Sequence, residues 1–495
     1  MSADLRSFEL YNNRAYGAKL KNSKGALATD LKASLRATSY LTAKRIFMTN
    51  YKLWERFGVE MEFMIVDRDT LNVLPRADVP LGKDKDGNQL SDIEYDDIGL
   101  SNELVSHVLE FKCAHPKSTF DGLGKRFFHE IRRANKKLEK INAMLLPSAC
   151  HPFMDPAEMQ LWPYDCLDIY QTYDRIFNCK GHGWANLQST HLNLSFDGDE
   201  EFGELHAAIR LLLPLIPAIA ASSPYLDSKY TGYRDARIEV YRHNQDKVPE
   251  ITGQVIPEQA YSYDEYNKMI FDKVKKAIAP YDTEHLLNHF FLNSRGAIAR
   301  FDRGAIEIRL VDIQECPNAD IAIVELEIAT LKAIVNGKFA ASRTSNGASA
   351  SDTSNTSSAN SVPHTLKEYR EFLRNFDTTR LAELLNKTVK DAENATIDWQ
   401  EYLSVFGMNF ATSPATTPAS APITAGDIWK HIYSVVKNDL TEVSQSFMEK
   451  MLERGTLSSA LYRALGDAPA HEAFVTEYKK LADCLAHNRL YGISE

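Results

Sequence analysis

The sequence has little cysteine, and the six cysteines of its 495 residues show no pairing. No CxxC pair and no zinc-type spacing occurs among them. A disulfide framework and a structural zinc site are therefore not expected. A reducing compartment, the cytoplasm, is the predicted location.

Long apolar runs are missing as well. No stretch approaches the roughly 20 apolar residues that a helix needs to span a bilayer. The segment Met1 to Arg6 lacks the basic-then-apolar order of a signal peptide. No association with a membrane is therefore predicted.

Basic residues are fewer than acidic residues, 57 against 67. The formal net charge is -10, and no long Lys/Arg run occurs. Nucleic acids and anionic membranes are bound by clustered basic surfaces, so neither is an expected partner. A basic row on the helix predicted over residues 121–146 is read as a solvated face.

The common phosphate-binding loops are absent too. The sequence contains no GxxxxGK[ST] loop and no Gly-rich dinucleotide loop between a strand and a helix. It also lacks the GxSxG elbow of serine hydrolases and the HExxH helix of zinc proteases. Any nucleotide site in this chain must therefore be built from metal ions and a sheet.

What the sequence does contain is a strand in which carboxylates interrupt an apolar run, Gly58 to Val66. Successive side chains of a strand point to opposite faces, so Glu60 and Glu62 share one face and the apolar residues the other. Two adjacent carboxylates repel each other and are costly to bury, so a cation is expected between them. The alternative is a strand whose glutamates are simply solvated.

Three further segments repeat this pattern of one polar and one apolar face. They contribute Glu110 and Lys112 from the segment 103–112, His191 and Asn193 from 191–196, and Glu307 and Arg309 from 305–310. If these segments form one antiparallel sheet, their polar faces become the floor of a pocket. Oxygen-rich ligands favour Mg²⁺ or Mn²⁺, and carboxylates with arginines suit a polyphosphate such as ATP.

The rest of the chain predicts helices and two low-complexity tracts. Residues 1–54 read as a helical lead-in, 55–339 as the catalytic domain, 340–362 as a linker or loop, and 363–495 as a helical C-terminal region with a Pro/Thr/Ala-rich loop at 411–425. Helices are expected over 121–146, over 205–221 with a break at its prolines, from Asp320 to about Asn336, and over 427–454. Residues 81–97 read as a loop. The predicted fold class is α+β, an antiparallel sheet with helices on its apolar face.

Taken in order, these segments resemble the glutamate-cysteine ligase family, in particular its second bacterial type of carboxylate–amine ligases, which are related to glutamine synthetase. The matching pieces lie between about residues 55 and 335: Gly58 to Phe63, Glu103 to Glu110, His191 to Ser195, Ala221 to Pro224, Thr231-Gly232 with Arg237, Gly253 to Pro257, and Arg300 to Arg309.

The resemblance implies a glutamine-synthetase-like fold and a role for each matching residue. It implies that five residues hold Mg²⁺ around the phosphates of ATP: Glu60, Glu62, Glu110, His191 and Glu307. Arg309 would steady the transferring phosphoryl group with Arg300 beside it, and Lys112 would contact the phosphates. Arg237 would bind substrate, near the acceptor carboxylate or the phosphates, and Asn193 would also contact substrate. Each carboxylate could instead be an ordinary salt-bridge partner.

Two positions depart from the pattern of the family. Met61 stands where many members have a third glutamate, and its side chain belongs to the apolar face. Asn193 stands where one branch has a second histidine, which leaves the amine substrate open.

The resemblance therefore implies an ATP-dependent ligase with glutamate and cysteine as its leading substrates. Two alternatives remain, a ligase for another amine and a non-catalytic protein that keeps the sheet for binding. Association into homo-oligomers also stays open.

Overall fold

The computed structural model describes residues 51–339, 365–408 and 422–493. The predicted helical lead-in at 1–54 lies almost wholly outside these ranges, as do nearly all of the two low-complexity tracts. Among the described residues, none of the helices combines the length and the apolar character that crossing a membrane requires.

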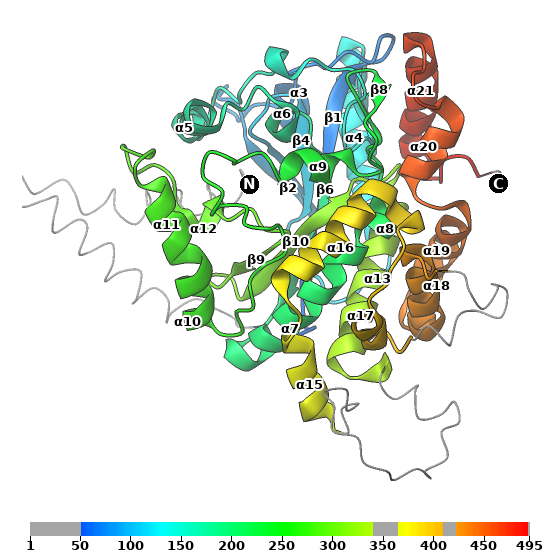
Figure 1. Ribbon diagram of the computed structural model, residues 1–495. Coiled ribbons are helices and arrows are strands. Elements are labelled where there is room, and N and C mark those ends of the chain that lie inside the picture. Colours follow the sequence, from blue (N-terminus) through cyan, green and yellow to red (C-terminus); the bar gives the residue numbers. More distant parts are fainter. Residues whose placement is uncertain (1–50, 340–364, 409–421, 494–495) are drawn as a thin grey trace, which may run out of the picture.

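An antiparallel sheet organises the molecule (Figure 1), in the order β2-β3-β4-β1-β6-β10-β9, with β5 paired to the far end of β1. Its strands are β1 (Phe57–Asp67), β2 (Asp92–Tyr95), β3 (Ile98–Asn102), β4 (Val108–Cys113), β5 (Ala143–Leu146), β6 (Ser189–Ser195), β9 (Ala297–Arg300) and β10 (Ala305–Asp312). A separate hairpin joins β7 (Tyr225–Leu226) to β8 (Lys229–Tyr230). The predicted antiparallel sheet is confirmed.

The two faces of the sheet differ as the alternation of side chains predicts. Val59, Met61 and Phe63 of β1 are completely buried, and so is Leu192 of β6. Thr190 Oγ1 donates a 2.6 Å hydrogen bond to Asp320 Oδ1 of helix α13, which ties this face to the helical layer. Apolar burial on the helical side leaves the glutamates and His191 on the other face.

Helices surround the sheet and continue into the C-terminal region. Those before residue 340 are α3 (Asp78–Leu81), α4 (Leu123–Leu138), α5 (Leu167–Phe177), α6 (His182–Ala185), α7 (Gly198–Leu212), α8 (Pro217–Ala220), α9 (Ala236–Tyr241), α10 (Tyr263–Tyr266), α11 (Asp272–Ile278), α12 (His289–Leu292) and α13 (Pro317–Val335). Those after it are α15 (Leu366–Arg374), α16 (Thr378–Asp391), α17 (Gln400–Val405), α18 (Ala425–Val436), α19 (Glu442–Arg454), α20 (Leu457–Leu465) and α21 (His471–His487). The break expected within 205–221 is present, because α7 and α8 are separated at the prolines.

Helices α15, α16 and α18 of the C-terminal region pack on the segment of α7 and α8 (Figure 1). The hydroxyl of Tyr402 donates a 2.6 Å hydrogen bond to the carbonyl of Leu211, and the indole of Trp429 donates one of 2.8 Å to the carbonyl of Leu215. All four residues are buried. The predicted helical character of this region is confirmed, and its helices share a core with the sheet domain.

Two predicted helices are too long. The helix predicted over 121–146 ends at Leu138, and after the left-handed Asn142 the chain enters β5. Leu145 pairs there with Ile65 of β1, and so short an apolar strand cannot be told from another helical turn by spacing alone. The helix predicted over 427–454 is two helices, because the chain breaks at Leu440 and Thr441 caps α19.

Two further boundaries differ from the prediction. Residues 92–95, assigned to a loop, form β2 because they find a partner in β3. Helix α13 begins at Pro317 rather than at Asp320, and Cys316 occupies the position before its first turn. Asp320 lies inside that first turn, where it accepts hydrogen bonds from Thr190 and from the backbone N–H of Gln314.

Candidate active site

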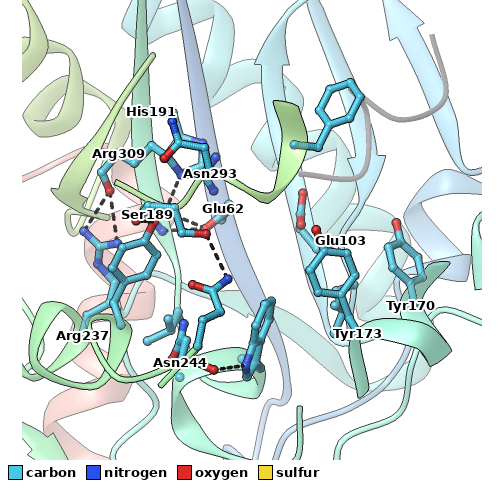
Figure 2. A pocket seen from close by; sticks show the side chains of 18 residues that line it. Glu62, Glu103, Tyr170, Tyr173, Ser189, His191, Arg237, Asn244, Asn293 and Arg309 are labelled. Atoms are coloured by element: carbon cyan, nitrogen blue, oxygen red, sulfur yellow. Dashed lines mark hydrogen bonds between the residues drawn. The ribbon is translucent and has the colours of Figure 1, made fainter. Parts of the chain in front are cut away.

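One cavity opens over the polar face of the sheet (Figure 2). Its floor includes Glu62, Ser189, His191 and Arg309. Its walls come from five other parts of the chain: Glu103 and Leu104 before β4, Tyr170 and Tyr173 of α5, Gly183, Trp184 and Leu187 in and after α6, Arg237 and Tyr241 of α9, and Phe291, Asn293 and Ser294 before β9. In Figure 2, Arg237 and Arg309 lie on one side of Glu62, and Tyr170 and Tyr173 lie on the other. The cavity therefore has arginines on one side of Glu62, and the two tyrosines together with Glu103 on the other.

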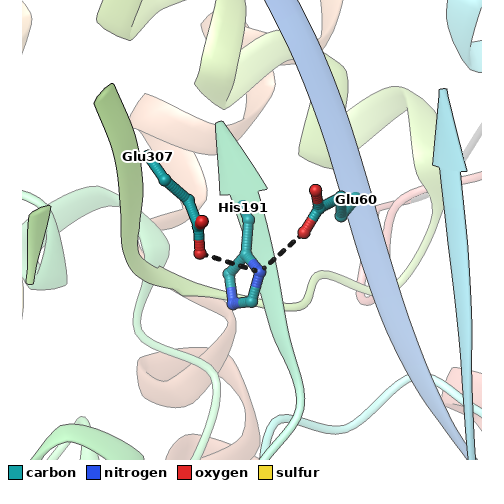
Figure 3. Close-up of side chains that lie close together, drawn as sticks. All are labelled: Glu60, His191 and Glu307. Carbon is teal, nitrogen blue, oxygen red and sulfur yellow. Dashed lines mark hydrogen bonds and ion pairs between the residues drawn. The ribbon is translucent and has the colours of Figure 1, made fainter. Parts of the chain in front are cut away.

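Strand register brings the first cluster of ligand-type residues together (Figure 3). Glu60 of β1 stands directly opposite His191 of β6, and Glu307 of β10 stands opposite Asn193, the next residue on the same face. His191 Nδ1 lies 3.1 Å from Glu60 Oε2 and 3.9 Å from Glu307 Oε1. One ligand atom from each of the three residues lies within 4.8 Å of the other two.

A second cluster consists of three buried carboxyl groups, those of Glu62, Glu103 and Glu110. Glu62 and Glu110 are directly opposite each other on β1 and β4, and Glu103 comes from the loop before β4. Burial, together with the nearby charges of Glu110 and Glu62, raises the pKa of Glu103 to about 8. Carboxylates crowded in this way repel one another when ionised, and a divalent cation between them would offset that repulsion.

Ser189 and His191 connect the two clusters. The backbone N–H and the hydroxyl of Ser189 both donate to Glu62 Oε2, at 2.8 Å and 2.9 Å. The Ser189 hydroxyl also lies 2.8 Å from His191 Nε2. Burial, with the nearby Arg309, lowers the pKa of His191 to about 4, so its imidazole is neutral at pH 7, the form that binds metals.

Two arginines flank the first cluster. Arg300 Nη2 lies 2.9 Å from Glu307 Oε2, and Arg309 Nη1 lies 2.5 Å from Glu307 Oε1. Burial alone would raise the pKa of Glu307, but Arg300 and Arg309 outweigh it and hold the pKa well below its ordinary value. Glu307 is thus ionised, and each of its oxygens would share its lone pairs between an arginine and any metal ion. Within the described ranges, the buried Nε of Arg309 has no hydrogen-bond partner.

The remaining residues implied by the resemblance lie nearby, in different settings. Asn193 Nδ2 donates a 3.2 Å hydrogen bond to Glu60. Lys112 Nζ lies 2.6 Å from Asp92 Oδ2 and 3.6 Å from Glu110 Oε1, so it pairs with one carboxylate of the second cluster. Both belong to the polar face but are not among the residues that line the cavity.

Arg237 lines the cavity, but part of its guanidinium is already engaged. Its Nε donates to Asp312, and both Nη atoms lie 3.3 Å from the carbonyl oxygen of Arg309. Asp312 is held in turn by the backbone N–H of Ser222 at 2.8 Å and the hydroxyl of Ser223 at 2.7 Å. Although burial disfavours the charge, Asp312 and Asp235 keep the pKa of Arg237 above its ordinary value.

Sequence patterns did not reveal several residues of the site. Glu103 lies in a loop, where alternation gives no signal, although the family resemblance includes it in a matching segment. Tyr170 and Tyr173 of α5 line the cavity as well. Nothing in the local sequence pointed to Trp184, Asn244 or Asn293, which only the fold brings there.

The donor chemistry fits a hard divalent cation. Carboxylate oxygens predominate in both clusters and one neutral imidazole joins them, which suits Mg²⁺ or Mn²⁺ better than zinc. An antiparallel sheet with such a face, and with helices on its back, defines a protein of the glutamine-synthetase-like fold class. The chain belongs to glutamate-cysteine ligase family 2 (GCS2), whose family model matches residues 56–344.

Individual proteins are similar to this chain in sequence. A protein of Archaeoglobus fulgidus named only as uncharacterized is 37% identical over 283 residues, which are 56% of this chain and 74% of that protein. A provisionally named glutamate-cysteine ligase 2 of Corynebacterium glutamicum is 21% identical over 52% of this chain, and the match spans 61% of that relative, less than two thirds of its length.

A solved structure has a similar fold. The crystal structure of glutamate-cysteine ligase from Francisella tularensis in complex with AMP superposes with a TM-score of 0.50 at 10% sequence identity. The superposition covers 89% of each chain. At this identity the likeness concerns the fold alone.

Proposed function

We propose that the protein is an ATP-dependent carboxylate–amine ligase that joins the side-chain carboxylate of glutamate to the amine of cysteine. The observation that carries this proposal is the pair of ligand clusters, Glu60–His191–Glu307 and Glu62–Glu103–Glu110, on one face of the sheet with Arg309 beside them. Membership of glutamate-cysteine ligase family 2 supports it and supplies the leading substrates.

The proposed reaction has two steps. In the first, the γ-phosphoryl group of ATP passes to an oxygen of the substrate carboxylate, which gives an acyl phosphate and ADP. In the second, the amine nitrogen attacks the acyl carbon, inorganic phosphate leaves, the nitrogen loses a proton and the amide is formed. Bound Mg²⁺ or Mn²⁺ would neutralise charge on the phosphate oxygens.

The residues of the chain have separate roles in this scheme. Glu60, Glu62, Glu110, His191 and Glu307 hold the cations, and Glu103 joins this set on the basis of its place in the second cluster. Arg309 neutralises charge on the transferring phosphoryl group, with its buried Nε as an available donor. Arg300 fixes the orientation of Glu307, and Lys112 supports Glu110 and the phosphates.

The amino-acid substrates occupy the part of the cavity beyond the clusters. Arg237 contacts a substrate carboxylate with those N–H groups that are not bonded to Asp312 or to the carbonyl of Arg309. Asn193 donates to Glu60 and so helps to hold the polar face of the sheet. Excluding water from the cavity protects the acyl phosphate from hydrolysis, and the aromatic side chains of Tyr170 and Tyr173, on the other side of Glu62 from Arg237, serve this purpose.

ADP release with ATP, Mg²⁺ and glutamate, measured with a panel of amines, tests the proposal. Strict dependence on cysteine supports the glutamate–cysteine pair. Turnover with a different amine keeps the chemistry and changes the acceptor, since acceptor choice depends on a few contacts. No turnover with any pair would favour a non-catalytic binding protein.

Glu62→Gln and Glu307→Gln test the metal assignment. Each removes one negative charge at nearly constant volume, and we expect ADP formation to fall at least about 100-fold, with folding retained by circular dichroism. Glu94→Gln on the exposed side of β2 is the matched control and leaves the rate unchanged. Near-normal turnover in both site variants would refute the assignment.

A further inference from the structure

Helix α9 and the residues after it form one wall of the cavity. Arg237 and Tyr241 belong to this helix, and Asn244 and Gln245 follow it. Arg237 and Tyr241 face the cavity, whereas the residues just before the helix contact α16 and α20 of the C-terminal region. Those helices lie beyond residue 344, where the family match ends.

Two backbone hydrogen bonds join the residues before α9 to the last turn of α16. The N–H of Arg234 donates to the carbonyl of Lys390 and the N–H of Asp235 to the carbonyl of Val389, each at 3.0 Å. The last four carbonyls of a helix have no partner inside it, so the end of α16 offers acceptors at this place. The side chain of Asp235 then caps α9 by accepting from the N–H of Ile238 at 2.8 Å.

Side chains reinforce the same junction. The guanidinium of Arg234 lies 3.9 Å from the ring centroid of Tyr462 in α20 and 5.3 Å from that of Tyr230. At the other end of α9, Arg242 Nη1 donates a 2.6 Å hydrogen bond to Asn386 Oδ1 of α16. Neither Arg234 nor Arg242 lines the cavity.

A short path connects this junction to the catalytic face. Ser223 accepts the N–H of Arg237 at 3.1 Å and donates to Asp312, the residue that also holds the Arg237 side chain. The Nη atoms of Arg237 reach the backbone of Arg309. A shift in the first turn of α9 would therefore move Arg237 relative to the phosphoryl-transfer residues.

We infer that α16 and α20 set the position of α9, and that Arg234 and Arg242 are positioning residues for the substrate-binding wall that carries Arg237. This inference rests on the proposed function, and it gives the C-terminal region a role in substrate binding. In this role, α16 and α20 hold α9, and with it Arg237, in place beside the cavity.

Steady-state kinetics of Arg234→Ala and Arg242→Ala in the full-length protein test this inference. We expect the KM for glutamate or for the amine to rise about tenfold, because a small misplacement of binding groups costs this much or more. The KM for ATP and the Tm should stay close to those of the unmodified protein. Arg234→Lys keeps a cation over Tyr462 and should restore the KM to within about threefold.

Arg132→Ala is the matched control. Arg132 also lies over an aromatic ring, that of Phe128 at 5.7 Å, but it is exposed on α4 and takes no part in the wall of the cavity. This variant should leave every KM unchanged. Unchanged amino-acid KM values in both Arg234→Ala and Arg242→Ala would overturn the inference, and so would a parallel rise in all KM values with a lowered Tm.

Hydrogen exchange separates the failure of this inference from the failure of the proposed function. If the unmodified protein turns over no acid–amine pair, the proposed function fails, but the backbone amides of residues 234–245 can still be followed. Faster exchange there in Arg234→Ala, with unchanged exchange in the sheet, supports the anchoring of α9. Unchanged exchange in that segment overturns it.

Discussion

At the scale of single residues, several cationic and polar groups of the site contact the same carboxylate oxygens. Glu307 lies between two arginines and beside the neutral imidazole of His191. The arginines keep it ionised without any metal ion, so the first cluster is organised in advance. In the second cluster, burial raises the pKa of Glu103 to about 8, and a cation bound there would compensate the charge of its carboxylate.

Glu103→Gln tests the place of Glu103 in the second cluster. Losing one anionic ligand weakens binding of a hard cation, so we expect the Mg²⁺ concentration for half-maximal ADP formation to rise about 10-fold to 100-fold. Titration of activity against Mg²⁺ at saturating ATP measures this, with Glu94→Gln as the control. An unchanged Mg²⁺ dependence would exclude Glu103 from the cation site.

At the scale of elements, caps decide where helices end when apolar spacing alone would let them continue. The apolar stripe over 427–454 runs through two helices, and Thr441 starts the second one. Its backbone N–H and its hydroxyl both donate to Glu325 of α13, at 2.9 Å each, and the hydroxyl accepts from the N–H of Ser444 at 3.4 Å. Thr441 thus starts a new helix within the apolar stripe and links α19 to α13.

Thr441→Ala should therefore lower stability without affecting the site. We expect the free energy of unfolding to fall by about 1–2 kcal/mol, the usual cost of losing such a cap. Urea denaturation measures the change. Thr476→Ala, which removes only an exposed hydroxyl that bonds to the preceding turn of α21, should cost less than half of this. Equal losses in the two variants would argue against a special role for Thr441.

At the scale of the whole molecule, one buried acid links stability to pH. Glu327 of α13 is completely buried, and neither of its carboxyl oxygens has a hydrogen-bond partner within the described part of the chain. Burial raises its pKa from 4.5 to about 8. The folded protein therefore holds a proton that the unfolded chain loses between these two values, so this group favours folding fully below about pH 4.5 and progressively less as the pH rises to 8.

Glu327→Gln should flatten the dependence of stability on pH. The carboxyl contributes a loss of about 1 kcal/mol in unfolding free energy for each pH unit within this window, and the amide does not titrate. Chemical denaturation of the variant and of the unmodified protein at pH 5, 6, 7 and 8 gives the slope of unfolding free energy against pH for each. The other titrating groups contribute equally to both slopes, so the difference between the slopes reports on Glu327. Parallel curves would show that Glu327 is ionised in the folded protein.

By itself, the sequence determined the fold class, the family and the polar face of the sheet. Alternation along β1, β4, β6 and β10 is a local property, and it placed Glu60, Glu62, Glu110, His191 and Glu307 on faces opposite the apolar core before their pairing was known.

Only the tertiary structure decided register, helix ends and the walls of the cavity. Register placed Glu60 opposite His191, because strands far apart in the sequence meet according to the whole sheet. Glu103 and the residues of α9 joined the site through loops and helix packing, which leave no periodic trace in the chain. Contacts between residues more than 100 positions apart, such as that of Arg234 with Lys390, follow from packing and cannot be read from local pattern.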